Sequence, residues 1–442
     1  MSNVFPRVLG HDLPRVARAK GSVIWDTDGK RYLDASGGAI VVGIGHGDAG
    51  VLRALAEQAR AVAYAHGTQF TSEALEAYAA DVAPLLPLAD GRIYPVSGGS
   101  EAVETALKLA RAYHLARGEE RRDRIIARWG SYHGNTLGAL DASGREPLRR
   151  PYEPWLGRAA HVPAPYEYRC PNPAHPSGCG DWHAEALERQ IEELGADSVA
   201  CFVAEPVAGA TLGAAVPPDE YWPAIQDVCR RHEILLIVDE VMTGFGRTGR
   251  WFGSDHWQFR PDILAAGKGA SSGYWPLGLA ACSAEVFETV SGSGFVHGFT
   301  HSHSVVGAAV GRAVLARLKE GSLVETSHEK GEHLLKELTA ALAEDPHVGD
   351  VRGLGLMIGV ELVADRGTKA SFPRKAKAIE RVIGAARDFG LLLYPSTGCA
   401  DGTNGDLIML GPPFVITDIE LEEVVEKTRL AIGSLREVPA SR

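Results

Sequence analysis

Two residues whose side chains could act in one catalytic site each follow a short apolar segment. Asp239 comes directly after the run Ile234–Val238, and Lys268 closely follows Ile263–Ala266, with a glycine on each side of it. Uninterrupted apolar runs of this length are typical of strands buried on both faces of a parallel sheet. In open sheets of this kind, ligands bind at the carboxyl ends of the strands. We therefore expect the carboxylate and the amine to meet at one edge of a sheet.

This pairing indicates pyridoxal 5'-phosphate as a cofactor. A lysine forms a Schiff base with that cofactor, and a carboxylate faces its ring nitrogen. The negative charge keeps the nitrogen protonated, because an adjacent anion favours the cationic form. Taken singly, Asp239 and Lys268 have a simpler interpretation, as a turn-capping carboxylate and a solvent-exposed lysine. The interpretation as a cofactor site depends on further contacts to the phosphate and the ring.

A glycine-rich turn before a helix is the predicted phosphate site. A short strand ends in the sequence Ser97–Ser100, and alanines and leucines at helical spacing follow it. Converging backbone amides and the partial positive charge of a helix N-terminus bind phosphate. The alternative is an ordinary N-cap formed by Ser100, with Glu101 next to the helix dipole.

Two other predicted strands end in side chains that could contact the same ligand. Tyr132 follows the apolar segment Arg124–Arg128 and could stack on an aromatic ring, although an aromatic core residue is the alternative. Glu205 follows the apolar run Val199–Ala204 and places another carboxylate at a strand end. Both are expected at the same edge of the sheet as Asp239.

A segment rich in proline, histidine and tyrosine, residues 151–181, is predicted to be a long surface loop. In and just after it stand Cys170, His175, Cys179 and His183, which could form a tetrahedral zinc site. Their spacing matches no strong zinc signature. We therefore expect surface residues of an irregular loop and no metal site.

Alternating strands and helices predict an α/β fold. Strand, loop and helix repeat from about residue 93 to residue 285, which indicates a mostly parallel sheet covered by helices. A hairpin at 23–34 and an α+β segment at the C-terminal end are expected to form a smaller domain. The predicted division is residues 1–60 in the small domain, 61–320 in the large cofactor-binding domain and 321–442 in the small domain again.

Length, composition and charge narrow the class of protein. At 442 residues the chain is longer than one hydrophobic core usually organises, which suggests two domains or one large domain with a smaller one attached. A net charge of −11 argues against nucleic-acid binding and against binding to an anionic membrane surface. Six scattered cysteines, no signal-like N-terminus and no membrane-length apolar run predict a cytoplasmic protein.

From about Val23 to Leu430 the chain resembles the class III aminotransferases, which are pyridoxal-phosphate enzymes of fold type I with a seven-stranded type of sheet. The resemblance rests on motifs in the family's order: Gly99-Ser100-Glu101-Ala102, Tyr132-His133-Gly134, Glu205-Pro206, Asp239-Glu240-Val241, Gly267-Lys268-Gly269 and Gly298-Phe299-Thr300.

The resemblance implies a role for each matching residue. Lys268 would hold the cofactor as a Schiff base and then move a proton, since a lysine with a lowered pKa acts as both nucleophile and base. Asp239 would pair with the ring nitrogen. Further cofactor contacts are implied for Gly99 and Ser100 at the phosphate, Tyr132 and Val241 at the two ring faces, His133, Gly134 and Glu205 nearby, and Thr300 from a second subunit. A homodimer, or a dimer of dimers, is expected.

Departures from the family pattern bear on the substrate. Met242 follows the Asp-Glu-Val motif, as in the amine and ω-amino acid:pyruvate branch of the family. That branch has an arginine in the C-terminal region that pairs with the glutamate of the Glu-Pro motif and binds the acceptor. The segment Tyr394–Asp406 contains no arginine. Glu205 is therefore expected to lack this partner, and Arg150 or an arginine of the second subunit is expected to bind the carboxylate.

The expected activity is transfer of an amino group from an amine or ω-amino acid to a 2-oxo acid, with pyruvate as the acceptor. Ile40, Val41 and Phe70 are expected to line an apolar substrate pocket. The alternative is an amino-acid racemase, epimerase or decarboxylase, which the same fold supports. A non-catalytic ligand-binding protein is less favoured, because both Lys268 and Asp239 are present.

Overall fold

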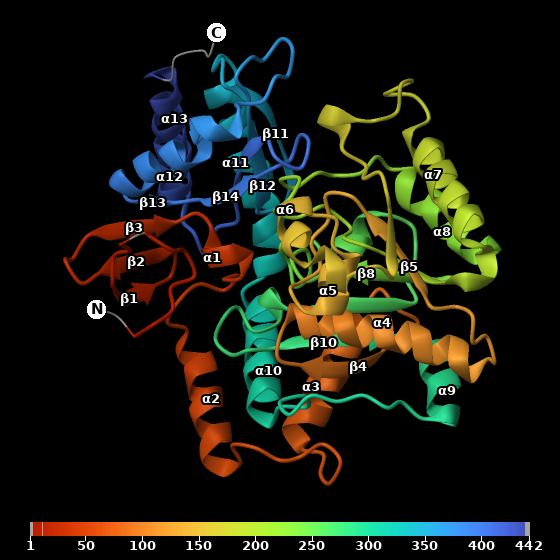
Figure 1. The fold of residues 1–442 in the computed structure, drawn as a ribbon. Coiled ribbons are helices and arrows are strands. Elements are labelled where there is room, and N and C mark those ends of the chain that lie inside the picture. Colours follow the sequence, from red (N-terminus) through yellow and green to blue (C-terminus); the bar gives the residue numbers. More distant parts are fainter. Residues whose placement is uncertain (1–2, 11, 438–442) are drawn as a thin grey trace.

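A seven-stranded sheet lies at the centre of the chain in the computed structural model, which describes residues 3–10 and 12–437 (Figure 1). Six strands run parallel, and β10 runs antiparallel to both of its neighbours. The strand order is β4 (Arg92–Val96), β10 (Gly278–Cys282), β9 (Ile263–Ala266), β8 (Leu235–Asp239), β7 (Val199–Ala204), β5 (Arg124–Arg128) and β6 (Ala159–Val162). The mostly parallel α/β sheet predicted from the sequence is confirmed.

Alternate residues of the central strands pack into two separate cores. Every residue of β7 and β8 is buried. Cys201 and Val203 join one apolar cluster, whereas Phe202 and Ala204 join the other. Successive side chains of a strand point to opposite faces, so this division places one core on each face of the sheet. Both faces must then be covered by helices.

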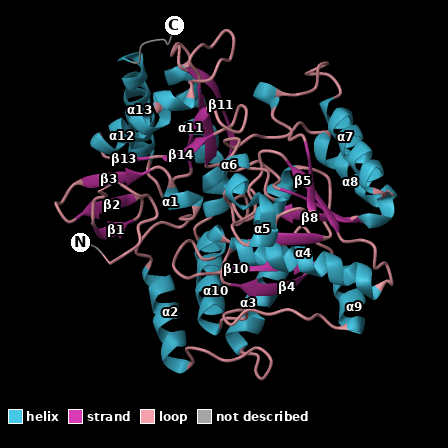
Figure 2. Cartoon of the chain, in the orientation of Figure 1, coloured by secondary structure: helices cyan, strands magenta, loops and turns pink. Residues whose placement is uncertain are grey.

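Two sets of helices cover these faces (Figure 2). The smaller core contains residues of α4 (Gly99–Ala116), α5 (Leu137–Ala142) and α9 (Ala284–Ser293). The larger core contains residues of α3 (Glu73–Val82), α7 (Cys179–Leu194), α8 (Tyr221–Arg231) and α10 (Val305–Glu320). Parallel strands buried in this way need helices on both sides, as is usual for sheets of this class.

The two ends of the chain meet in one small sheet. The strands β1 (Val16–Lys20), β2 (Val23–Asp26) and β3 (Arg31–Asp34) form an antiparallel meander, and β13 (Leu391–Leu392) pairs in parallel with β3. This sheet lies beside α12 (Ala378–Asp388) and α13 (Asp418–Gly433) in Figure 1. Both ends therefore contribute to the smaller α+β part, as the fold prediction required.

A third sheet belongs wholly to the C-terminal part. It contains β11 (Val348–Leu354), β12 (Met357–Leu362), β15 (Asp406–Leu410) and β14 (Tyr394–Thr397), all antiparallel. The long helix α11 (Leu323–Leu342) packs against β11. The remaining helices are α1 (Gly37–Ile40), α2 (Ala49–Ala61) and α6 (Glu146–Arg149). The division of the chain at residues 60 and 320 stays a prediction.

Two segments differ from their predicted structure. Residues 151–181 are not a continuous loop, because β6 extends the central sheet along β5 and α7 begins at Cys179. The four residues of β6 are too few to show a periodic pattern. The hairpin predicted at 23–34 has a third strand, because β1 pairs with β2. Among the described helices, none has both the length and the apolar character needed to cross a membrane.

Candidate active site

Lys268 and Asp239 lie at the ends of adjacent parallel strands. Asp239 pairs in register with Ala265 of β9, and Lys268 begins the short turn that follows β9. Desolvation lowers the pKa of the half-buried Lys268 amine to about 8, while the charges of Asp239 and Glu205 act in the opposite direction. An amine with this pKa is partly neutral near neutral pH, so it can act as a nucleophile or a base.

A histidine orients the Asp239 carboxylate. Asp239 Oδ2 lies 2.7 Å from Nδ1 of His133, and Oδ1 accepts a hydrogen bond of 2.9 Å from the Val241 amide. Both Asp239 and His133 are buried. The His133 backbone amide in turn donates to Ser143 Oγ at 2.8 Å. The carboxylate is therefore held at a defined angle at the strand end.

The neighbouring Glu240 binds the protein backbone and does not face the proposed cofactor site through a free oxygen. It is buried and accepts hydrogen bonds from the Gly253 and Ser254 amides at 2.8 and 2.7 Å, and from the Ser254 and Thr243 hydroxyls. Burial raises the pKa of Glu240, and these donors act against that increase. Because its oxygens bind the protein's own backbone, Glu240 stabilises the turn after β8.

Glycines allow close packing where α4 begins. A Cβ atom added to Gly99 would lie 2.7 Å from Val241 Cγ1, and one added to Gly134 would lie 2.4 Å from Ser100 Oγ. Ser100 Oγ also accepts a hydrogen bond of 3.2 Å from Asn135 N. No described side chain caps the start of α4, where Gly98 is the N-cap. The ordinary Ser100 N-cap considered above is therefore wrong, and the first amides of α4 are left for another acceptor.

Glu205 has a buried partner within this chain. Arg128 Nη2 donates to the Glu205 backbone oxygen at 2.6 Å and to Oε2 at 3.3 Å, and both side chains are buried. Arg128 also lies against the rings of Tyr221 and Trp222. The other Glu205 oxygen accepts from the Tyr132 amide at 3.4 Å. Glu205 therefore has an arginine partner, supplied by the end of β5 and not by the C-terminal region.

The arginine named as a carboxylate-binding candidate is on the surface. Arg150 is exposed, whereas Arg145 is half-buried near Tyr132 and Tyr394. Arg145 Nη2 donates to Ser396 Oγ at 3.3 Å, and its buried Nε has no hydrogen-bond partner among the described residues. Desolvation lowers the Arg145 pKa from its ordinary value. No local pattern in the sequence distinguishes Arg145 from Arg150.

The predicted substrate-pocket residues are in different surroundings. Ile40 is buried, and a Cβ atom added to Gly411 would lie 2.6 Å from it. Val41 is half-buried next to Gly273. Phe70 is 67% exposed, and Thr300 is exposed in the loop before α10. Phe70 and Thr300 thus lie on the surface of the single chain.

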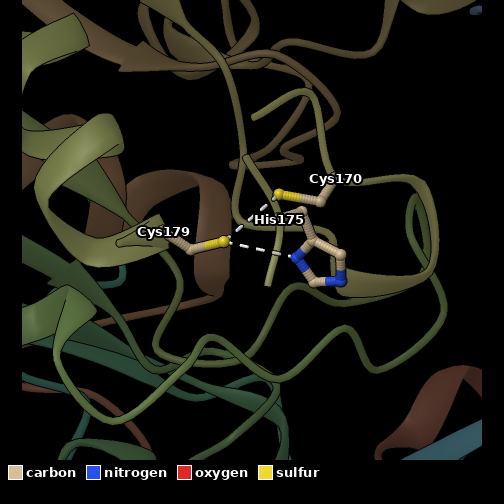
Figure 3. A group of neighbouring side chains, drawn as sticks. All are labelled: Cys170, His175 and Cys179. Carbon is tan, nitrogen blue, oxygen red and sulfur yellow. Dashed lines mark hydrogen bonds between the residues drawn. The ribbon is translucent and has the colours of Figure 1, made fainter. Parts of the chain in front are cut away.

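Three of the four residues considered above as possible metal ligands lie together, although the sequence favoured no metal site (Figure 3). The Sγ atoms of Cys170 and Cys179 are 3.7 Å apart, and His175 Nδ1 is 3.3 Å from Cys179 Sγ. His183 is not a member of this group and packs against the ring of Tyr221. The irregular loop therefore brings two thiols and an imidazole to one point.

Comparison with known proteins places the chain in a family. The profile described as Aminotransferase class-III matches residues 9–432. The uncharacterized aminotransferase YodT of Bacillus subtilis is 40% identical over 419 residues, covering 94% of each chain. The putrescine–pyruvate aminotransferase of Pseudomonas aeruginosa is 33% identical, over 94% of this chain and 89% of the relative. An (S)-enantioselective omega-transaminase from Thermomicrobium roseum has a TM-score of 0.92 and 36% identity, over 98% of this chain and 96% of that one. The chain belongs to the class III aminotransferases, as its motifs indicated.

Proposed function

We propose that this aminotransferase moves an amino group from an amine or an ω-amino acid to a 2-oxo acid, with pyruvate as the acceptor. The observation that carries the proposal is the placement of Lys268 and Asp239 at adjacent strand ends, beside the glycine-lined start of α4. The names of two similar proteins, a putrescine–pyruvate aminotransferase and an omega-transaminase, support this substrate class.

Class III aminotransferases use pyridoxal phosphate, and the described residues fit this cofactor. The uncapped amides of α4 offer donors for a phosphate, and Gly99 and Gly134 let the backbone pack closely against Val241 and Ser100. Asp239 offers an anion for the ring nitrogen, and Lys268 offers the amine. When bound, the cofactor supplies a ring that accepts the electron pair left on a substrate carbon after deprotonation.

We assign the chemical steps to two side chains. Lys268 would hold the cofactor through its amine and, once free, would accept and return the proton of the substrate carbon, because this amine is partly neutral near its pKa of about 8. Asp239 keeps the ring nitrogen protonated, and His133 holds Asp239 in place. These roles require Lys268 and Asp239 to reach one and the same ring.

The remaining matching residues are assigned to cofactor binding. Gly99, Ser100 and Gly134 surround the phosphate. Tyr132 and Val241 would contact the ring, while Glu205 supports the Tyr132 backbone by accepting a hydrogen bond from its amide. The exposed Thr300 completes the phosphate site of a second copy of the chain, which requires at least a homodimer. Six free cysteines favour a cytoplasmic location.

Substrate binding is assigned to Arg145 and an apolar pocket. Arg145 is half-buried near Tyr132, and no described carboxylate forms an ion pair with it. A guanidinium in this setting suits the carboxylate of a 2-oxo acid, which it can bind through two parallel hydrogen bonds. Ile40, Val41 and the exposed Phe70 are proposed to contact the apolar part of the amine, with Phe70 acting across the dimer interface.

The visible spectrum of the purified protein tests this function. We expect a yellow protein that bleaches when an amine donor is added and regains its colour with pyruvate. Lys268→Ala should abolish both changes. A yellow protein that no amine bleaches, with an inverted or decarboxylated amino acid as product, would favour the racemase or decarboxylase alternative. A protein that stays colourless with added pyridoxal phosphate would contradict the cofactor assignment.

A further inference from the structure

The loop before α7 brings three metal-binding atoms together outside the active site (Figure 3). They are the sulfurs of Cys170 and Cys179 and a ring nitrogen of His175, and all lie within 4.8 Å of one another. Cys179 is buried at the start of α7, Cys170 is half-buried and His175 is exposed. The aminotransferase mechanism uses none of these residues.

The two distances from Cys179 Sγ to the other members of the group match those around a tetrahedral zinc ion. With Zn–S near 2.3 Å and Zn–N near 2.0 Å, tetrahedral angles place two sulfurs about 3.8 Å apart and a sulfur and a nitrogen about 3.5 Å apart. The observed separations are 3.7 Å between the sulfurs and 3.3 Å between Cys179 Sγ and His175 Nδ1. A disulfide needs a separation of about 2.0 Å, so the sulfurs are not bonded to each other.

An asparagine side chain supports the ligands. Asn172 is buried, and its Nδ2 donates to Cys179 Sγ at 3.4 Å and to the Ser177 carbonyl at 3.0 Å. Its Oδ1 accepts from the Ala174 amide at 2.9 Å. A hydrogen bond from an amide to the ligand sulfur is the kind of outer contact that stabilises a metal-bound thiolate and orients it. Asn172 therefore holds the loop in the shape that the three ligands need.

We propose that Cys170, His175 and Cys179 bind one zinc ion. Binding displaces the two thiol protons, so that two thiolates, a neutral imidazole and Zn²⁺ give a site with no net charge. The three protein ligands leave a fourth position, on the exposed side of the loop, for water. Two thiolates and one imidazole favour zinc over magnesium or calcium, which prefer oxygen ligands.

A bound zinc ion would order the segment around Cys170, which lies next to the cavity that contains Arg145. Pro171, adjacent to Cys170, lines a cavity of about 360 Å³ together with Arg145, Arg169 and the loop Thr397–Gly402. Arg169 Nε donates to Glu361 of β12 at 2.7 Å. Zinc would therefore link the start of α7 to a segment that already contacts the C-terminal sheet and borders Arg145.

Metal analysis of the intact holoenzyme tests the proposal. We expect one zinc ion per chain after exposure to Zn²⁺ and dialysis, and release of two protons per ion bound. Replacing the zinc by Co²⁺ should give the absorption bands of a thiolate-bound tetrahedral ion. Zinc should also slow hydrogen exchange of the amides in residues 170–178.

Matched variants separate this site from adventitious binding. Cys170→Ser, Cys179→Ser and His175→Ala should each lower zinc retention at least tenfold. Cys282→Ala, in β10, and His333→Ala, exposed on α11, should retain it fully. His175 is itself exposed, so its variant is expected to fold even if a cysteine variant does not. Unchanged zinc binding by His175→Ala would overturn the proposal, as would a reduced protein that retains no zinc, or a Cys170–Cys179 disulfide in the protein as purified.

Discussion

The Nδ1 atom of His133 lies 2.7 Å from Asp239 Oδ2, with both side chains buried. The two residues come from distant parts of the chain, since His133 lies in the loop after β5 and Asp239 ends β8. Because the other Asp239 oxygen is bound to the Val241 amide, the carboxylate has little freedom to turn. The pair therefore presents a fixed negative charge at the edge of the sheet, next to Lys268.

We expect Asp239→Asn to lower kcat by about 100-fold or more. Loss of a group that controls protonation in the reaction commonly has an effect of this size. The amide keeps the size of the carboxylate but lacks its charge, so the ring nitrogen would lose its proton. His133→Asn should have a smaller effect, because the charge remains and only its orientation is lost. Steady-state kinetics with saturating cofactor would measure both. Equal kcat values for Asp239→Asn and the wild type would contradict the assigned role.

Cofactor attachment should depend on pH through the Lys268 amine. Its pKa is lowered to about 8, and only the neutral amine can attack a carbonyl group. The attachment rate in cofactor-free protein should therefore rise as the pH increases towards 8 and level off above it. Stopped-flow absorbance at a series of pH values would measure this rate. A rate that keeps rising well above pH 8, without levelling off, would contradict the lowered pKa, and Lys268→Ala is the blank.

Arg145→Gln should raise the KM for pyruvate at least tenfold. The substitution removes a hydrogen bond between two charged groups, and such a bond contributes about 1.5–3 kcal/mol to binding. The KM for an amine donor without a carboxylate should change little, because that substrate has no anion to bind. Arg150→Gln is the matched control, since that side chain is exposed and is expected to leave both KM values unchanged. Equal increases for both substrates would assign Arg145 a structural role instead.

Arg128→Met should destabilise the fold by about 3–5 kcal/mol, because it leaves the buried Glu205 carboxylate without its partner. Arg121 is the control. It forms an ion pair with Asp197, but its side chain is 79% exposed, so Arg121→Met should cost about 1 kcal/mol or less. Urea unfolding of both variants would measure the difference. Similar losses of stability would mean that the Arg128 pair contributes no more than a surface pair.

Strand ends were the part of the site that the sequence could predict. Asp239 and Lys268 follow uninterrupted apolar runs, and buried parallel strands produce such runs directly. The Arg128–Glu205 pair could not be predicted, because nothing local indicates that two residues 77 positions apart share a buried contact. Arg145 and Arg150 look alike in the sequence, and only packing near Tyr394 distinguishes them. Likewise, the spacing of Cys170, His175 and Cys179 gave no signature, since the turn at Asn172 brings them together.

Two adjacent glycines, Gly98 and Gly99, allow a test of the close packing at the start of α4. A Cβ atom added to Gly99 would lie 2.7 Å from Val241 Cγ1, whereas one added to Gly98 would have no atom within 4 Å. Gly98 also has extended backbone, which any residue adopts. Gly99→Ala must therefore displace the Val241 side chain, at a cost of about 1–3 kcal/mol.

We expect Gly99→Ala to weaken pyridoxal phosphate binding about tenfold or more, and Gly98→Ala to change it less than twofold. Titration of the cofactor-free proteins, followed by visible absorbance, would give both dissociation constants. Because the two substitutions are chemically identical and adjacent, a difference between them reports the contact with Val241 and not the propensity of the helix. Equal affinities for the two variants would mean that Val241 does not contact the cofactor, and would remove it from the proposed ring site.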